Sequence, residues 1–107
     1  MKKKILCMCQ KGNSRSVACA YWLKKKYGMD AIACGFKTQG MDTLEMLVDW
    51  ADRVILMAPQ YYERFPDKWK EKTIILNVGH DTYFKGHDQN LLDQCERFIK
   101  LNKICES

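Results

Sequence analysis

The sequence lacks the patterns that mark a disulfide-stabilised or zinc-binding domain. It has six cysteines in 107 residues, but no two of them have Cys-x-x-Cys spacing. The two histidines, His80 and His87, flank a loop that has no cysteine pair at ligand spacing. We therefore expect free, mostly buried thiols in a reducing cytoplasm, with no bound metal and no cofactor.

Long apolar runs and low-complexity tracts are also missing. The apolar stretch near the N-terminus is far too short for the core of a secretory signal. Nothing in the chain approaches the length of a membrane-spanning helix, and there is no internal repeat or linker. We expect a single domain over residues 1–107, located in the cytoplasm and without a membrane partner.

The charge balance is modestly positive, with a net charge of +5. Such a balance suits phosphorylated or otherwise anionic partners. Lysine runs at residues 2–4 and 24–26 could indicate nucleic-acid binding. However, they fall at the expected ends of a strand and a helix, and cations in the last turn of a helix interact favourably with its dipole. Nucleic acid is therefore not the favoured partner.

Apolar periodicity predicts strands that alternate with helices. The expected strands are residues 3–8, 30–36, 54–57 and 73–78. The expected helices are residues 16–27, a helix capped by Asp42 with Glu45 three residues later, a helix from Pro59 to Pro66, and a final helix from Asp88. This alternation predicts an α/β fold of three layers, in which a four-stranded parallel sheet of order 2-1-3-4 has helices on both faces.

The segment Cys9–Ser16 reads Cys-Gln-Lys-Gly-Asn-Ser-Arg-Ser and joins the first predicted strand to the first predicted helix. A loop that opens a helix directs backbone N–H groups inward, and the helix N-terminus carries about half a positive charge. This environment favours the thiolate form of a cysteine, which is the nucleophilic form. The guanidinium of Arg15 matches two oxygens of a phosphate group. The segment therefore predicts a cysteine nucleophile, a loop that binds an anion through its backbone N–H groups, and an arginine clamp on two phosphate oxygens.

This segment resembles the phosphate-binding loop of the low-molecular-weight protein tyrosine phosphatases, in which Cys, five residues and Arg-Ser follow the first strand. The sequence departs from the family pattern at two places. Lys11 and Gly12 stand where the family usually has Gly and Asn, and Asn13 comes one position later. Ser14 stands where the family often has a second Cys. The loop also resembles the IIB components of sugar phosphotransferase systems, but those carriers lack the arginine at position 15.

A second match lies in the loop of residues 79–87, after the last predicted strand. Asp81-Thr82-Tyr83 resembles the Asp-Pro-Tyr of the family, whose Asp is the general acid, although Thr82 replaces the proline. Residues 50–57 resemble the entry to the third strand of the family. The resemblance covers nearly the whole chain and fits a short bacterial subgroup.

The predicted strand order brings these segments to one edge of the sheet, at the switch point between the first and third strands. The resemblance implies a cysteine-dependent phosphatase that acts on phosphotyrosine in a protein or on another phosphate monoester. Its implied catalytic residues are Cys9 as nucleophile, Arg15 as clamp, Ser16 as hydrogen-bond partner of the thiolate, and Asp81 as general acid. Its implied substrate-binding residues are Gln10, Lys11, Gly12, Asn13, Ser14 and Tyr83.

The aromatic residues near the third predicted helix have two interpretations. Tyr61, Tyr62 and Phe65 have helical spacing, which is typical of core residues. Tyr83 and Phe84, in the loop, are the better candidates for walls around a phenyl ring.

Three other functions remain open at this point. A IIB-type carrier would accept phosphate on Cys9 and pass it to a sugar. A phosphopeptide-binding module with weak activity would tolerate the shifted Gly12-Asn13. An arsenate reductase would need resolving cysteines, and neither Cys95 nor Cys105 is obviously placed to reach Cys9. The oligomeric state and the physiological substrate are not encoded in any motif.

Overall fold

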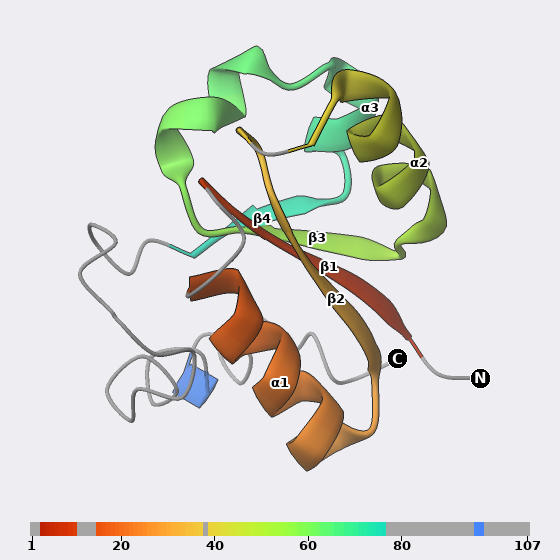
Figure 1. Cartoon of the computed structure of the whole chain (residues 1–107), viewed down its shortest axis with the longest axis vertical. Coiled ribbons are helices and arrows are strands. Elements are labelled where there is room, and N and C mark those ends of the chain that lie inside the picture. The colour runs from red at the N-terminus through yellow and green to blue at the C-terminus, as the bar shows by residue number, and fades with distance from the viewer. Residues whose placement is uncertain (1–2, 11–14, 38, 77–95, 98–107) are drawn as a thin grey trace.

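The structure is a computed structural model that describes residues 3–10, 15–37, 39–76 and 96–97. Its centre is a sheet of the four strands β1 (Lys4–Cys9), β2 (Asp30–Gly35), β3 (Arg53–Leu56) and β4 (Thr73–Ile75). All neighbouring strands pair in parallel, in the order β2-β1-β3-β4. The predicted α/β fold and strand order are thus confirmed (Figure 1).

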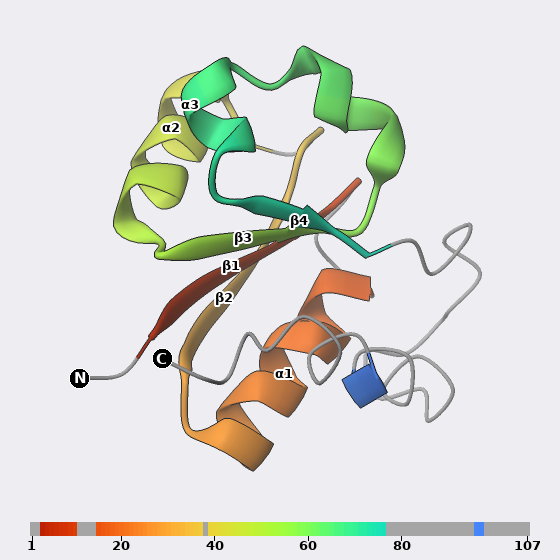
Figure 2. The same ribbon diagram turned by 180° about the vertical axis from the view of Figure 1, so that it is seen from behind.

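Helices cover both faces of this sheet (Figures 1 and 2). The helix α1 (Arg15–Tyr27) lies on one face. The helix α2 (Met41–Trp50), the 3₁₀ helix η1 (Pro59–Arg64) and the short helix α3 (Asp67–Lys70) lie on the other. The predicted loop over residues 79–87 and nearly all of the helix predicted from Asp88 lie outside the described residues.

The central strand β1 explains why the core has two halves. Its residues 5–9 have no exposed surface, and successive side chains point to opposite faces. One half of the core gathers Ile5 and Cys7 with residues of α1, and the other gathers Leu6 and Met8 with residues of α2, η1 and α3. An apolar run buried on both faces is typical of a parallel strand. β1 therefore holds its last residue, Cys9, on a fixed support.

Two helix boundaries differ from the sequence-based prediction. α2 begins at Met41 with Gly40 as its N-cap and without a side-chain cap, so the prediction of a cap at Asp42 is wrong. Asp42 lies instead inside the first turn, where its charge still interacts favourably with the helix dipole. The helix predicted from Pro59 to Pro66 is the 3₁₀ helix η1, which ends at Arg64, and the short helix α3, with Pro66 at its N-cap, was not predicted.

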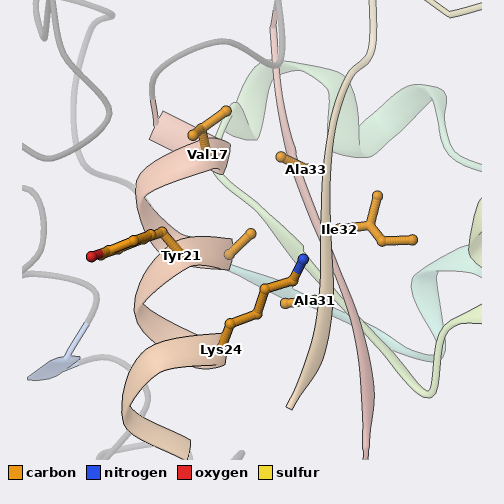
Figure 3. Close-up of a pocket in the computed structure, with 7 residues that line it drawn as sticks. Val17, Tyr21, Lys24, Ala31, Ile32 and Ala33 are labelled. Atoms are coloured by element: carbon orange, nitrogen blue, oxygen red, sulfur yellow. The ribbon is translucent and has the colours of Figure 1, made fainter. Parts of the chain in front are cut away.

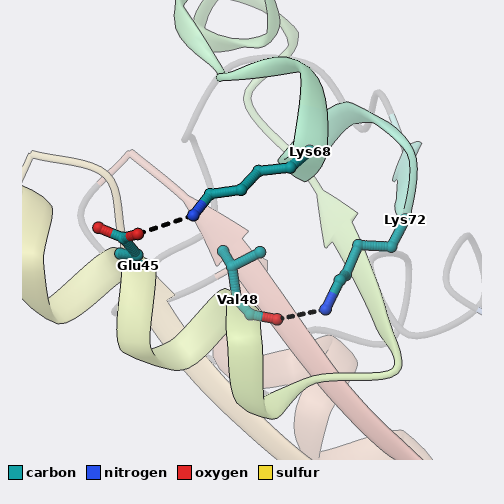
Figure 4. Close-up of polar contacts among 4 residues, drawn as sticks. All are labelled: Glu45, Val48, Lys68 and Lys72. Carbon is teal, nitrogen blue, oxygen red and sulfur yellow. Dashed lines mark hydrogen bonds and ion pairs between the residues drawn. The ribbon is translucent and has the colours of Figure 1, made fainter.

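The C-terminal end of α2 is held by a lysine from the loop before β4. The ammonium of Lys72 donates a hydrogen bond to the carbonyl oxygen of Val48 at 2.7 Å (Figure 4). It donates a second one to the carbonyl oxygen of Ala51 at 2.8 Å. Carbonyls in the last turn of a helix have no partner within the helix, and a cation there also favours the dipole. Lys72 therefore links the end of α2 to the segment that leads into β4.

A second lysine nearby makes a different kind of contact. Lys68 pairs with Glu45 at 2.7 Å, and this hydrogen bond raises the pKa of Lys68 above its usual value (Figure 4). The side chain of Lys68 is 57% exposed and that of Glu45 is 50% exposed. Exposed ion pairs contribute little to stability because water and salt screen them.

These two lysines give a matched test of the packing. Lys72→Met should lower the free energy of unfolding by about 1–2 kcal/mol, because it removes two hydrogen bonds at the end of α2, and only the Val48 carbonyl keeps another donor, the N–H of Ala51. Lys68→Met should have a clearly smaller effect. Urea unfolding followed by circular dichroism measures both. Equal losses in the two variants would contradict a special role for Lys72.

Candidate active site

The candidate site begins with a contact between the end of β1 and the start of α1. The sulfur of Cys9 lies 3.2 Å from the hydroxyl oxygen of Ser16, the second residue of α1. Both residues are fully buried, and Ser16 is the single polar residue with that property among those the structure describes. A buried hydroxyl requires a hydrogen-bond partner, and here the partner is the predicted nucleophile.

The electrostatic setting of this contact favours an anion. The first turn of α1 has no acidic residue, and its last turn carries Lys24, Lys25 and Lys26. The N–H groups of a first helical turn have no partner within the helix, and they add to the positive end of the dipole. Because Ser16 belongs to that turn, the sulfur of Cys9 lies within reach of this positive end.

The other predicted residues of the loop can be placed only in part. Arg15 is the first residue of α1, which sets its backbone beside Ser16. Its side chain is outside the described part of the structure, as are residues 11–14, which include the predicted binding residues Lys11, Gly12, Asn13 and Ser14. Gln10 is described, and its carbonyl accepts a hydrogen bond from the N–H of Lys37 at 2.9 Å.

The ends of the neighbouring strands lie beside Cys9. The N–H of Phe36, just after β2, donates to the carbonyl of Cys9 at 2.8 Å. On the other side, the N–H of Met57, just after β3, donates to the carbonyl of Met8 at 2.7 Å. The residues that follow β2 and β3 therefore flank the candidate nucleophile at the carboxyl edge, where parallel sheets bind their ligands.

An aromatic cluster stands next to this edge. The ring of Phe36 stacks on Tyr61 at 4.4 Å and lies 6.0 Å from Phe65. Tyr61 and Phe65 are buried, as their helical spacing predicted. The guanidinium of Arg64 lies 5.1 Å from the centre of the Phe36 ring. Sequence reasoning missed Phe36, Lys37 and Arg64, although the position of Phe36 and Lys37 directly after a predicted parallel strand was a usable indication.

Cys34 is the thiol that interacts electrostatically with the candidate nucleophile. Burial and, to a smaller extent, the nearby Cys9 together raise the pKa of Cys34 to about 12. Cys34 therefore remains a neutral thiol at neutral pH and does not compete as a nucleophile. Cys7, Cys9, Cys19 and Cys34, the cysteines that the structure describes, are buried thiols that form no disulfide, as expected.

Several predicted features lie beyond the described residues. These are the general-acid candidate Asp81, the ring candidates Tyr83 and Phe84, the histidines His80 and His87, and the cysteines Cys95 and Cys105. Within the described ranges, no group of three or more His, Cys, Asp or Glu side chains could hold a metal ion. No helix in those ranges has the length and apolar character needed to cross a bilayer.

A groove of about 340 Å³ lies between α1 and β2, separate from the contact between Cys9 and Ser16. Its lining is apolar apart from one cation and includes Val17, Ala20, Tyr21, Lys24, Ala31, Ile32 and Ala33. Figure 3 shows that the Ile32 side chain points away from α1. Of the predicted catalytic residues whose side chains are described, neither Cys9 nor Ser16 lines this groove, so it is distinct from the candidate active site.

Comparison with solved structures identifies the fold. The chain is similar to the tyrosine phosphatase Wzb from Escherichia coli K30, solved with sulphate, at 15% identity and a TM-score of 0.66, over 95% of this chain and 99% of that one. It is also similar to the YwlE arginine phosphatase from Geobacillus stearothermophilus, at 18% identity and a TM-score of 0.60, over 98% and 97% of the two chains.

A YwlE mutant from Bacillus subtilis matches with 16% identity and a TM-score of 0.60, over 95% of this chain and 99% of that one. No protein-family model matches this chain, and neither does any curated protein sequence. At these identities the likeness establishes a shared fold along nearly the whole chain. Chemistry must be argued from the residues of this chain.

The buried Cys34 thiol makes the stability of the protein depend on alkaline pH. Its ordinary pKa of 9.0 applies to the unfolded chain, and its folded pKa is about 12. Between these values the unfolded state loses a proton that the folded state keeps. The free energy of unfolding should therefore fall as pH rises, with a slope of up to about 1.4 kcal/mol per pH unit from this group.

Cys34→Ala should remove that contribution, so that its stability declines less steeply with pH than that of the wild-type protein. Urea unfolding under a reducing agent, repeated across this pH range, measures the slopes. All other titrating groups are common to both proteins and cancel in the comparison. Parallel pH profiles would show that Cys34 titrates normally in the folded state.

Proposed function

We propose that this protein is a cysteine-dependent phosphatase that hydrolyses phosphate monoesters, with phosphotyrosine in a protein as its substrate. The observation that carries the proposal is the contact of Cys9 with Ser16 at the N-terminus of α1. The fold adds support, because tyrosine and arginine phosphatases share it. The buried, free thiols of the described cysteines fit a reducing, cytoplasmic setting.

The proposed first step is attack of the Cys9 thiolate on phosphorus. A sulfur–phosphorus bond forms, the bond to the leaving oxygen breaks, and Asp81 gives that oxygen its proton. Arg15 and the backbone N–H groups of residues 10–15 hold the equatorial oxygens, where charge is spread in the transition state. Tyr83 borders the ring of the substrate.

The second step is hydrolysis of the phosphocysteine. Asp81, now ionised, takes a proton from water, water oxygen bonds to phosphorus, and the sulfur–phosphorus bond breaks. The electron pair returns to the sulfur of Cys9. The hydroxyl of Ser16, 3.2 Å away, donates a hydrogen bond to the departing thiolate and makes it a better leaving group. The reaction as written requires no metal ion.

Phosphoarginine is a second candidate substrate, because one protein of the same fold is an arginine phosphatase. The proposed cysteine chemistry would serve both, since only the leaving atom differs. Two assays separate the possibilities. The proposal expects turnover of p-nitrophenyl phosphate that EDTA does not reduce, and higher kcat/KM for a phosphotyrosine peptide than for the matched phosphoarginine peptide. The reverse preference would assign the second substrate, and phosphopeptide binding without turnover would favour a binding module.

Cys9→Ser should abolish turnover of p-nitrophenyl phosphate and leave binding of a phosphate analogue nearly intact. Binding depends on Arg15 and the backbone donors, whereas bond making depends on the thiolate. If Cys9→Ser keeps a tenth of the wild-type kcat, a loss of only about 1.4 kcal/mol, then Cys9 is not the nucleophile.

Arg15→Lys should be almost as inactive as Arg15→Ala, because lysine keeps the charge and loses the two-pronged geometry.

Asp81→Asn should slow the first step in a way that depends on the leaving group. The phenol released from phosphotyrosine has a pKa near 10, so its oxygen needs a proton as the bond breaks. The expected loss is roughly 10²–10⁴-fold for phosphotyrosine and much less for p-nitrophenyl phosphate, whose phenol is more acidic. Single-turnover kinetics isolate this step. Equal slowing of both esters would assign Asp81 to loop stability and move the search to Asp88 or the histidines.

A further inference from the structure

Two cationic side chains stand at the edge of the sheet where the candidate site opens. Lys37 follows β2, and its backbone N–H is bonded to the carbonyl of Gln10, the residue after Cys9. Its side chain is exposed. The backbone therefore fixes the position of Lys37 beside the start of the phosphate-binding segment, while its ammonium extends into solvent.

The second cation, Arg64, comes from η1 and lies on the face of the sheet opposite α1, where the rings of Phe36 and Tyr61 pack. Its guanidinium lies 5.1 Å from the centre of the Phe36 ring and 6.0 Å from that of Tyr61. Phe36 is in turn bonded through its N–H to the carbonyl of Cys9 at 2.8 Å. Arg64 is thus linked through Phe36 to the backbone of Cys9, although it lies 55 positions away in sequence.

Both cations are available to an external anion. Within the described part of the chain, neither Lys37 nor Arg64 forms an ion pair with a carboxylate. Glu63, which precedes Arg64 in sequence, does not pair with either cation. The aromatic contact holds the guanidinium without using its N–H groups, which form a fork suited to a carboxylate. The candidate site therefore has two cations, Lys37 and Arg64, in addition to Arg15, the residue proposed to hold the phosphate.

We propose that Lys37 and Arg64 form an anion subsite that binds a carboxylate of the substrate peptide, next to the phosphorylated residue. The inference rests on the proposed function and specifies its substrate class: phosphopeptides with Asp or Glu close to the phosphorylated position. An extended peptide advances about 3.3 Å per residue, so acidic residues one to three positions away fall within about 10 Å of the phosphate.

The contribution of such a subsite has a recognisable kinetic form. Lys37 and Arg64 contact a part of the substrate that does not react, so their attraction acts equally on the ground state and the transition state. Their removal should therefore raise KM for acidic peptides and leave kcat little changed. Because the cations are exposed, the preference should also weaken as ionic strength rises.

The test uses two phosphotyrosine peptides that differ only in whether their flanking residues are Glu or Gln. The ratio of their kcat/KM values at low salt measures the acidic preference. Wild-type protein should prefer the Glu peptide by about tenfold or more, Lys37→Gln and Arg64→Gln should each lower the ratio about three- to fivefold, and the double variant should bring it near one. Lys25→Gln is the control: it removes the same charge in the last turn of α1, at the end opposite Cys9.

Three outcomes would overturn the subsite: no acidic preference in the wild-type protein, an unchanged ratio in the double variant, or an equal loss in Lys25→Gln. Failure of the proposed function looks different, since p-nitrophenyl phosphate would then not be hydrolysed. In that case fluorescence anisotropy with the same two peptides still measures their affinities. Equal affinities would reject the subsite, and a preference lost in the double variant would support it.

Discussion

The candidate site depends on the contact between the sulfur of Cys9 and the hydroxyl of Ser16, at the carboxyl edge of the sheet. The contact forms because β1 is buried on both faces and ends at Cys9, and because α1 packs against that strand from its first turn. Two elements of regular structure thus meet at a separation of 3.2 Å. A helix N-terminus placed this close to a sulfur atom provides a positive potential for a bound anion.

The parallel sheet supplies what surrounds that contact. Because neighbouring strands run in the same direction, the residues after β2 and β3 lie beside Cys9 as a direct result of the sheet topology. Backbone hydrogen bonds fix Phe36 and Lys37 there, and η1 adds Tyr61 and Arg64 over the same ring. The fold thereby places the candidate nucleophile on its central strand and surrounds it with a rim formed by the segments that follow the neighbouring strands.

The sequence was sufficient for the features that depend on local patterns. The buried run of β1 and the alternation of strands and helices predicted the sheet order, and the resemblance of the segment Cys9–Ser16 to a known phosphate-binding loop predicted the contact of Ser16 with Cys9. The start of α2 was missed because Gly40 caps the helix through its backbone, which leaves no side-chain pattern to read. Arg64 could not be foreseen, since its place over Phe36 depends on tertiary packing between η1 and the segment that follows β2.

The central claim is that phosphate is transferred to Cys9, and the intermediate itself can be observed. The protein would be mixed with p-nitrophenyl phosphate, quenched within milliseconds and digested, and its peptides analysed by mass spectrometry for added phosphate. The account predicts phosphate on the sulfur of Cys9, at a level that rises and falls with turnover. Turnover without this adduct, or phosphate on another residue, would contradict it.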